Sequence, residues 1–355
     1  MTEPYWTPET LEEMVSARSK ILGPAVWAAA TPDPRQLISF AGGLPDIPSL
    51  PGEQLLRAAR TVIDREQKEA LEYGGTYGPA PLRDAIAERS TRIEGIPVTR
   101  DNVIIASGSA HAIGMVCETL LDAGDYVMVE SPNFPGSMRT IRSFGAHQVA
   151  IPMDEHGMRT EILAAELQKL ADQGKRAKFI YCIPTHQNPA GCTLSLERRH
   201  ELLELARKYQ TFVLEDDAYG ELWFETPPPP SLFALSNGDH GIKVSSFSKI
   251  IATGLRMGWI MGPPALVSPH RRVALRHGQQ SLPGPRHRRD DPQRRPGPAH
   301  RRPPPHLSAQ ARTGRGCVGP LLHRLHNVRA AAWWLLPLAP APPGDGLPRC
   351  AGRRQ

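Results

Sequence analysis

Along residues 100 to 265, short apolar segments alternate with longer segments whose apolar positions follow helical spacing. The short segments are rich in β-branched and aromatic residues and are bounded by glycine, proline or acidic residues, a pattern that predicts strands. In the longer segment 196–209, the apolar residues cluster at near-helical spacing, which predicts an amphipathic helix. Seven strands are expected, at residues 102–108, 125–132, 147–153, 178–184, 211–217, 242–248 and 256–262.

This alternation predicts the fold class. Strands separated by helices form α/β domains whose sheet is mostly parallel and is covered by helices. We therefore expect an α/β fold with a mostly parallel seven-stranded sheet and without internal repeats. Ligands of such sheets bind at the carboxyl ends of the strands, so polar residues that directly follow a strand are the first candidates for a functional site.

The last quarter of the chain differs in composition from the rest. Residues 1–268 contain 25 Lys and Arg against 33 Asp and Glu, whereas residues 269–355 contain 17 arginines and 15 prolines but no lysine and no glutamate. The net charge of +6 of the 355-residue chain therefore comes from this last segment. Its sequence has neither helical nor strand periodicity and buries too little apolar surface to offset its ordering entropy.

Three interpretations of this arginine- and proline-rich tail, residues 266–355, remain open. It could be a basic arm that binds nucleic acid, a disordered linker, or a segment translated in the wrong frame after a shift in the gene. We favour the frame shift, because lysine and glutamate disappear together while Arg, Pro, Ala, Gly and His rise, as expected for a G+C-rich strand read out of register. Sequencing the gene across the codons for residues 260–275 would test this interpretation.

The remaining composition excludes several classes of protein. No stretch of about 18 or more apolar residues is present, so no transmembrane helix is expected. The first 20 residues contain four glutamates and lack a basic leader followed by an apolar segment, which argues against a signal peptide. The five cysteines form no CxxC pair and no metal-ligand spacing. We expect a cytoplasmic protein with reduced thiols and no bound metal.

Small and polar residues follow four of the predicted strands. The segment SGSAH, residues 107–111, opens a predicted helix, so its backbone N–H groups could bind an anion such as phosphate. The alternative is an ordinary helix cap by Ser107 or Ser109. Each of the other three segments could be a turn or a cap when taken alone: residues 185–191, 216–219 and 247–249.

Taken together, these segments resemble the fold type I pyridoxal-phosphate enzymes, and specifically the class I/II aminotransferases. The resemblance rests on Asn188-Pro189-Ala190-Gly191, on Asp216 to Tyr219, on Ser246 to Lys249 and on Arg256, in this order. The branch with the aminoadipate, kynurenine and aromatic amino acid aminotransferases is most similar, through ISFAGGLPD (38–46), LEYGGTYGPAPLRDAIAER (71–89) and EDDAYGELWF (215–224). The resemblance covers about residues 10–265.

The resemblance also implies a domain organisation. Residues 1–45 would form an N-terminal arm and part of a small domain, and residues 46–265 would form the large domain that binds pyridoxal phosphate. The tail, residues 266–355, would then stand where the rest of the small domain is expected, so that domain would be absent or disordered. We therefore expect the chain as written to be poorly soluble or at best cofactor-binding, with negligible aminotransferase activity.

Roles at the cofactor, pyridoxal 5'-phosphate, follow from the same resemblance. Lys249 would form the Schiff base with the aldehyde and then act as general base, which requires a lowered pKa. Asp216 would face the protonated ring nitrogen, because the motif reads D-x-x-Y. Tyr219 and Asn188 would donate hydrogen bonds to the phenolic oxygen. Phe134 would stack on the cofactor ring, and the alternative is that it is a core phenylalanine.

Two further acids flank Asp216 at the end of the same predicted strand. Strand alternation sends Glu215 and Asp217 to the opposite face of the sheet from Asp216. We therefore expect both of them to be solvated or to cap a helix rather than to face the cofactor.

For the cofactor phosphate, the resemblance implies donors from two segments and one arginine. An arginine suits phosphate because its planar fork donates two hydrogen bonds. The family often carries glutamine where Ala110 stands, so a side-chain contact is missing here while the backbone donor remains. The implied donors are Ser109, the backbone N–H of Ala110, the hydroxyls of Ser246 and Ser248, and Arg256.

Partners and substrate contacts can be inferred only in part. Tyr73 resembles a tyrosine that reaches the phosphate of the neighbouring subunit, which implies a homodimer. The family binds the substrate carboxylate with Asn188 and with an arginine of the small domain, and no arginine of residues 266–355 can be assigned to that role. Gly43 could contribute a backbone contact to the substrate.

The function implied is transfer of an amino group from an amino acid to a 2-oxo acid, with 2-oxoglutarate as the usual acceptor. Neither nucleic acid nor a membrane is expected as a partner. Three alternatives stay open: another pyridoxal-phosphate enzyme such as a β-lyase or decarboxylase, the cofactor-binding effector domain of a transcription regulator, and an inactive truncated product. A regulator would need a DNA-binding domain, for which residues 1–35 are too short.

Overall fold

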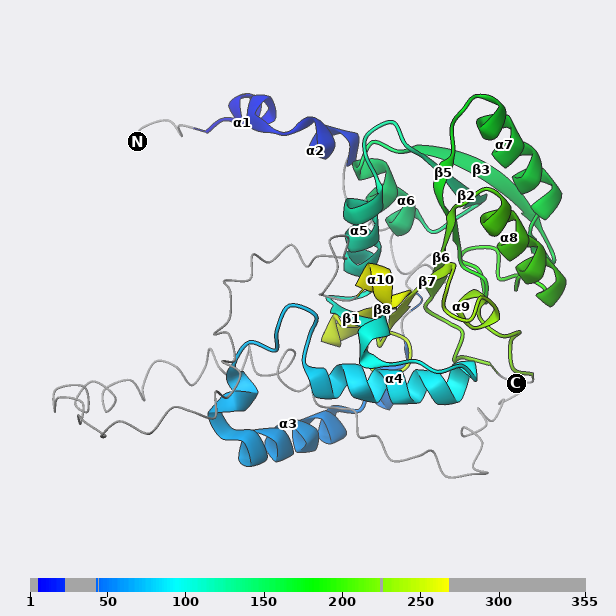
Figure 1. Ribbon diagram of the computed structural model, residues 1–355. Coiled ribbons are helices and arrows are strands. Elements are labelled where there is room, and N and C mark those ends of the chain that lie inside the picture. The colour runs from blue at the N-terminus through cyan, green and yellow to red at the C-terminus, as the bar shows by residue number, and fades with distance from the viewer. Residues whose placement is uncertain (1–5, 23–42, 44, 224–225, 268–355) are drawn as a thin grey trace, which may run out of the picture.

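The computed structural model describes residues 6–22, 43, 45–223 and 226–267 (Figure 1). The predicted tail, residues 266–355, therefore lies almost entirely outside the described residues, and the three domain boundaries stay predictions. Within the described ranges, no helix combines the length and the apolar character that are needed to cross a membrane.

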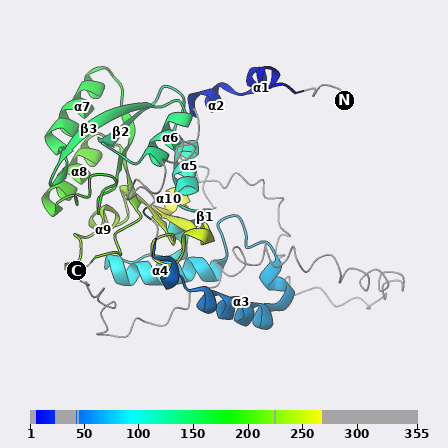
Figure 2. The ribbon, with the colours of Figure 1, turned by 180° about the vertical axis from the view of Figure 1, so that it is seen from behind.

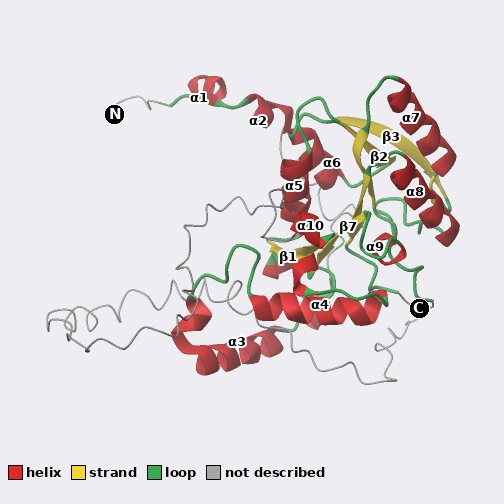
Figure 3. Ribbon diagram, viewed as in Figure 1, coloured by secondary structure: helices red, strands yellow, loops and turns green. Residues whose placement is uncertain are grey.

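In the part of the chain that the structure describes, one sheet of eight strands forms the centre of the fold (Figure 3). The strands are β1 (Val103–Ala106), β2 (Tyr126–Ser131), β3 (His147–Asp154), β4 (Gly157–Met158), β5 (Ala177–Cys182), β6 (Phe212–Asp217), β7 (Gly241–Ser246) and β8 (Gly258–Met261). Their order is β1-β8-β7-β6-β5-β2-β3-β4, with parallel pairing from β3 through β7 and antiparallel pairing of β8 with both of its neighbours. The mostly parallel α/β fold and its seven predicted strands are confirmed. The prediction missed β4, because two residues are too few to show a period.

Helices cover both faces of the sheet (Figures 1 and 2). On one face lie α5 (Ser109–Leu120), α6 (Pro135–Ser143) and α10 (Pro264–Val267), which share a buried apolar cluster with the sheet. On the other face lie α7 (Thr160–Asp172), α8 (Leu196–Lys208) and α9 (Leu232–Leu235), with a second cluster. Next to them, α4 (Ala80–Glu94) packs against β1 and β8. The predicted amphipathic helix at 196–209 is α8.

The remaining helices precede the sheet in the chain. They are α1 (Pro8–Met14), α2 (Ala17–Leu22) and α3 (Gly52–Glu66), together with the short 3-10 turns η2 (Ile47–Ser49), η3 (Gln67–Leu71) and η4 (Arg100–Asn102). One further 3-10 turn, η5 (Thr253–Leu255), lies between β7 and β8. Arg18 fixes α2 against α6: its Nη2 donates to Ser143 Oγ at 3.4 Å, and its guanidinium lies 3.9 Å from the centre of the Phe144 ring. The N-terminal segment therefore contacts the sheet's α5–α6 layer.

Alternation along β6 decides which side chains reach which layer. Leu214 packs in the α5–α6 cluster and Val213 packs in the α7–α8 cluster, and both are fully buried. Because successive strand residues point to opposite faces, Asp216 faces the α5–α6 layer with Leu214. Glu215 and Asp217 face the other layer.

Candidate active site

Three segments that are distant in the sequence meet at one edge of the sheet. Gly258, the first residue of β8, pairs with Ala106 on β1 and with Ser246 on β7. This row of three paired residues brings together the residues that follow β1, those that precede β8 and those that follow β7. The polar segment 107–110, Arg256 and the turn 247–249 are therefore neighbours.

Helix α5 begins in this group without a side-chain cap. Its N-cap residue is Gly108, at φ +86°, and no described side chain accepts a hydrogen bond there. The sequence alternative of a cap by Ser107 or Ser109 is therefore wrong; the Ser107 backbone N–H instead donates to His111 Nδ1 at 3.0 Å. Ser109 and Ala110 are the first two residues of the helix, so their backbone N–H groups have no partner inside it.

Arg256 lies against this helix start. A Cβ atom at Gly108 would be 2.9 Å from Arg256 Nη2, and one at Gly258 would be 2.6 Å from the Ser245 carbonyl oxygen and 3.0 Å from the Gly108 carbonyl carbon. Glycine at both positions thus allows the arginine and the helix to approach. We call this group, Gly108, Ser109, Ala110 and Arg256, the anion cradle, because a guanidinium and free N–H groups converge there.

Two serines extend the anion cradle toward β7. Ser246, the last residue of β7, is buried, and its hydroxyl donates to Ser248 Oγ at 2.9 Å. It also accepts a hydrogen bond from the Ser248 backbone N–H at 3.1 Å. The two hydroxyls predicted to bind phosphate therefore lie together at the carboxyl end of β7.

Lys249 follows in the same turn. Its Nζ donates to the backbone oxygen of Gly43 at 2.6 Å, so Gly43 contacts the predicted reactive amine. Burial lowers the pKa of Lys249 from its ordinary value. A lowered pKa raises the fraction of neutral amine near pH 7, which a nucleophile or a base requires.

Asp216 lies on the adjacent strand and is buried. Its Oδ2 accepts a hydrogen bond from Tyr181 Oη at 2.7 Å and a longer one from Ser137 Oγ at 3.5 Å. Its Oδ1 is buried and has no hydrogen-bond partner among the described residues. Burial raises the pKa of Asp216 to about 6. An unpartnered buried carboxylate oxygen is costly, so this site is suited to a ligand that donates a hydrogen bond.

Tyr219 and Asn188 are also brought together. Burial raises the pKa of Tyr219, and a hydrogen bond with the Asn188 side chain opposes that change. The neighbouring residue Gln187 fixes the loop that carries Asn188. Its Nε2 donates to the Pro132 carbonyl at 2.9 Å and to Glu130 Oε2 at 3.3 Å. Sequence reasoning missed Gln187 and Glu130, both of which are buried.

Two further residues predicted at the cofactor are Phe134 and Tyr73. Phe134 is the N-cap residue of α6 and is partly buried against the α5–α6 cluster, which fits both a ring-stacking and a core role. Tyr73 is fully exposed. Among the described residues, no group of histidines, cysteines and acids has the arrangement of a metal site.

The two acids that flank Asp216 lie on the opposite face, but they are not solvated. Glu215 caps α9, accepting from the backbone N–H groups of Leu232 and Phe233 at 3.1 and 3.0 Å. Asp217 is paired with Lys243 Nζ at 2.6 Å. The expectation of solvation or helix capping is therefore confirmed for Glu215, which caps α9, and is wrong for Asp217, which is paired with Lys243.

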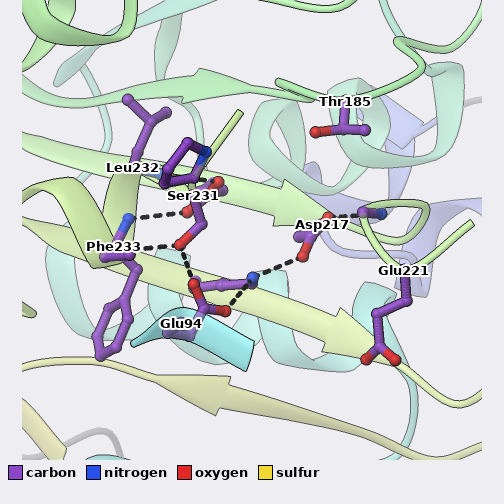
Figure 4. Close-up of polar contacts among 12 residues, drawn as sticks. Glu94, Thr185, Asp217, Glu221, Ser231, Leu232 and Phe233 are labelled. Carbon is purple, nitrogen blue, oxygen red and sulfur yellow. Dashed lines mark hydrogen bonds and ion pairs between the residues drawn. The ribbon is translucent and has the colours of Figure 1, made fainter. Parts of the chain in front are cut away.

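Lys243 is the centre of this buried charge cluster, because it contacts Glu94 and Asp217, which Figure 4 labels. Its Nζ also contacts Glu94 Oε1 at 2.6 Å, and Ser231 Oγ donates to the other oxygen of Glu94. Burial alone would lower the pKa of Lys243, but Asp217, Glu94 and Glu215 outweigh it and raise the pKa. The cluster joins α4 and the α9 segment to the sheet, on the face that does not carry the anion cradle.

Buried carboxyl groups make the stability of the ligand-free fold dependent on pH. Burial raises the pKa of Glu130 to about 8 and that of Asp216 to about 6. Between the unfolded and the folded pKa, the folded state binds more protons, so the free energy of unfolding falls as the pH rises. We expect the ligand-free protein to lose on the order of a few kcal/mol of stability between about pH 5 and pH 8 in urea unfolding experiments.

Glu130→Gln tests the source of this slope. The amide oxygen can still accept from Ile183 N and Gln187 Nε2, but the side chain no longer titrates. The variant should therefore lose less stability than the natural chain between about pH 6 and pH 8, whereas Glu118→Gln, at an exposed position, should keep the full slope. An unchanged slope in Glu130→Gln would contradict the assignment.

Comparisons with known proteins point to one family. The chain is 36% identical over 231 residues to "Aromatic-amino-acid aminotransferase 1" of Thermococcus litoralis. This match covers 65% of this chain and 55% of that protein. It is 32% identical, with a TM-score of 0.63, to the α-aminoadipate aminotransferase LysN from Thermus thermophilus, solved in complex with N-(5'-phosphopyridoxyl)-L-leucine; the match covers 72% of this chain and 62% of that one. The chain thus spans little more than half of the length of the first relative.

A regulator also appears among the relatives. The chain is 31% identical over 198 residues to "Uncharacterized HTH-type transcriptional regulator YisV" of Bacillus subtilis, which covers 56% of this chain and 40% of that protein. The match to the regulator therefore covers a smaller share of both proteins than the match to the aminotransferase of Thermococcus litoralis.

The family model and the ligand of the solved neighbour agree with the geometry of the site. The cofactor that they indicate is pyridoxal 5'-phosphate. The family model described as "Aminotransferase class I and II" matches residues 37–281, which is well over half of the chain. The chain therefore belongs to the class I and II aminotransferases.

Proposed function

We propose that this chain is the cofactor-binding part of an enzyme that transfers the amino group of an amino acid to a 2-oxo acid, using pyridoxal 5'-phosphate. The observation that carries the proposal is the unpartnered Oδ1 of the buried Asp216, at the same edge of the sheet as Lys249 and the anion cradle. Few ligands offer an N–H donor, an aldehyde and a phosphate together. Pyridoxal phosphate in its pyridinium form does.

Each part of the cofactor has a matching group in the protein. The pyridinium N–H would donate to Asp216 Oδ1, and the phenolic oxygen would accept from Tyr219 and Asn188. The phosphate would lie in the anion cradle, with Ser246 and Ser248 as further donors. Phe134 would cover one face of the ring. These roles are proposed from the geometry and from the family's motifs.

When bound, pyridoxal phosphate supplies an electron sink for the bond that breaks at the substrate Cα. The protein's own contribution is to hold and move protons. Asp216, as a carboxylate, would keep the proton on the ring nitrogen. Lys249, with its lowered pKa, would carry a proton on Nζ between positions on the substrate. Asn188 would hold the substrate carboxylate so that this transfer occurs over a short distance.

Assembly and location belong to the same proposal. Tyr73 is fully exposed, which supports a role at the site of a second subunit rather than its own. We therefore propose a homodimer in the cytoplasm whose substrates are a free amino acid and a 2-oxo acid such as 2-oxoglutarate. Analytical ultracentrifugation of the purified chain with cofactor would test the dimer.

The proposed function is tested by measuring cofactor binding and turnover separately on the 355-residue chain. We expect the folded chain to bind pyridoxal phosphate. With a panel of amino acids and 2-oxoglutarate, we expect negligible glutamate formation, because no arginine of the tail can be assigned to the substrate carboxylate. A folded chain that binds no cofactor would overturn the proposed function, whereas rapid turnover would support it and overturn the frame-shift interpretation.

The likeness to YisV favours one second candidate, a cofactor-sensing effector domain. Such a domain would bind pyridoxal phosphate through Lys249 but would not need to move a proton at the substrate Cα. Exchange of the Cα hydrogen of an amino acid with deuterated water distinguishes the two. We expect exchange for a part of an aminotransferase and none for an effector domain.

Gly108→Ala is expected to weaken the binding of pyridoxal phosphate. The new methyl group would meet Arg256 Nη2 at 2.9 Å and push the guanidinium out of the anion cradle. Hydrogen bonds to charged groups contribute enough that the dissociation constant should rise by about tenfold or more, measured by equilibrium dialysis.

Gly124→Ala is the matched control for this substitution. Gly124 also has a positive φ, +91°, but a Cβ there would meet nothing within 4 Å, and it precedes the amino end of β2, away from the site. It should change the dissociation constant by less than about threefold, because it adds backbone strain without displacing the arginine. Equal weakening by the two variants would argue against the anion cradle.

A further inference from the structure

Tyr181 stands on β5, the strand next to Asp216, and has no place in the motifs of the sequence. Cys182 pairs with Glu215 and Tyr181 with Leu214, so Tyr181 points to the same face of the sheet as Leu214 and Asp216. The side chain is fully buried, and its Oη donates to Asp216 Oδ2 at 2.7 Å. Its phenol stays a donor, because burial raises the pKa of Tyr181 well above its ordinary value.

The hydroxyl of Tyr181 is the principal donor that Asp216 receives from the described residues. The other one is Ser137 Oγ, from α6, at the long distance of 3.5 Å. The neighbouring acids Asp217 and Glu130 do not help to keep Asp216 ionised, because a negative charge on either one would raise its pKa. Tyr219 also lies close enough to interact electrostatically with Asp216.

A carboxylate with one oxygen bound and the other free has a defined orientation. Because Oδ2 is held by Tyr181, the side chain cannot rotate without breaking a short hydrogen bond in a buried site. Oδ1 is then left as the acceptor for a ligand. Burial by itself favours the neutral acid, which would no longer attract a cation, and the hydrogen bond from Tyr181 opposes this effect.

We propose that Tyr181 is a positioning residue of the cofactor site, whose hydroxyl holds Asp216 as a carboxylate with Oδ1 directed at the pyridinium nitrogen. The inference rests on the proposed function for the identity of the ligand. The contact between Tyr181 and Asp216, however, can be tested without any ligand. The substitution Tyr181→Phe keeps the aromatic ring, which packs in the core, and removes only the hydroxyl that donates to Asp216.

The first test uses the purified 355-residue chain without cofactor. Carbon-13 in the aspartate carboxyl groups reports the ionisation of Asp216 by NMR, and the signal is assigned by its loss in Asp216→Asn. We expect Tyr181→Phe to shift the titration midpoint of Asp216 upward by about one to two pH units, because a hydrogen bond to a charged group is lost. The control Tyr209→Phe removes a hydroxyl that donates to Gln168 Oε1 at 2.8 Å and should leave the midpoint unchanged. An unchanged midpoint in Tyr181→Phe would overturn the proposal.

A measurement on the unsubstituted chain covers the case in which Tyr181→Phe does not fold. With carbon-13 at Cζ of tyrosine, one buried tyrosine signal should titrate with the same midpoint as the Asp216 carboxyl and should stop titrating in Asp216→Asn. Absence of any such signal would overturn the proposal.

The second test separates this proposal from the proposed function. Tyr181→Phe should raise the dissociation constant of pyridoxal phosphate by about tenfold, but it should not change that of the analogue in which a C–H replaces the ring nitrogen. Equal losses for the two compounds would mean that Tyr181 acts only on the fold, and would overturn the proposal. If the unsubstituted chain binds neither compound, the proposed function fails, while the NMR titration still decides the role of Tyr181 toward Asp216.

Discussion

Replacement of Lys249 by alanine is expected to abolish the covalent trapping of pyridoxal phosphate by borohydride. The structure brings the Lys249 amine to the same strand edge as Asp216 and the anion cradle, and burial lowers its pKa. No other lysine follows β7 in the described part of the chain. Mass spectrometry of the reduced chain should show one cofactor per molecule in the natural sequence and none in Lys249→Ala.

Lys208→Ala serves as the matched control, because Lys208 is an exposed lysine at the end of α8. It should keep full trapping, and peptide mapping should find the cofactor on the peptide that contains Lys249. Trapping that survives in Lys249→Ala, or a modified peptide elsewhere, would refute the assignment of the reactive amine.

Lys243→Met is expected to destabilise the fold far more than the loss of an exposed lysine. Lys243 is buried and contacts Glu94 and Asp217, both at 2.6 Å, and Glu215 lies close enough to raise its pKa. Removing one partner of a buried ion pair leaves carboxylates without compensation, which costs about 3–5 kcal/mol. Urea unfolding at neutral pH should show this loss.

The comparison is with Lys178→Met, which removes a partly exposed ion pair with Asp125 at 3.2 Å. Solvent screens such a pair, so its loss should cost less than about 1 kcal/mol. Similar losses for Lys243→Met and Lys178→Met would show that the buried cluster contributes little to stability. Partial recovery in the double variant Lys243→Met with Asp217→Asn would support the explanation by uncompensated charge.

The strands and the order of the polar motifs could be predicted from the sequence, because both depend on local patterns. The seven apolar segments of the sequence all form strands, and each polar motif lies at or just after the end of one of these strands. That Ser246 and Ala106 would lie on either side of Gly258 could not be predicted in this way. It depends on β8 inserting between β1 and β7, which no local pattern encodes.

Residues that support the site from neighbouring strands were missed for the same reason. Tyr181 and Glu130 lie within apolar strands, and their roles appear only when the register with β6 and the loop of Gln187 is known. A signal was present for Lys243, since a lysine inside an apolar strand conflicts with its surroundings and requires a partner. The solvated position expected for Asp217 was wrong because Lys243, on the neighbouring strand β7, forms an ion pair with it.

The position of β8 between β1 and β7 has a consequence for the order of folding. Within the described residues, β1 is an edge strand whose one neighbour in the sheet is β8, and all of β2 to β7 separate the two in the chain. Contacts of such long sequence separation form slowly, because a large loop must close before they stabilise anything. During synthesis, the anion cradle cannot assemble until Met261 has been added and β8 is complete. A nascent chain stalled before that point would therefore contain most of the parallel strands but no anion cradle to bind the phosphate.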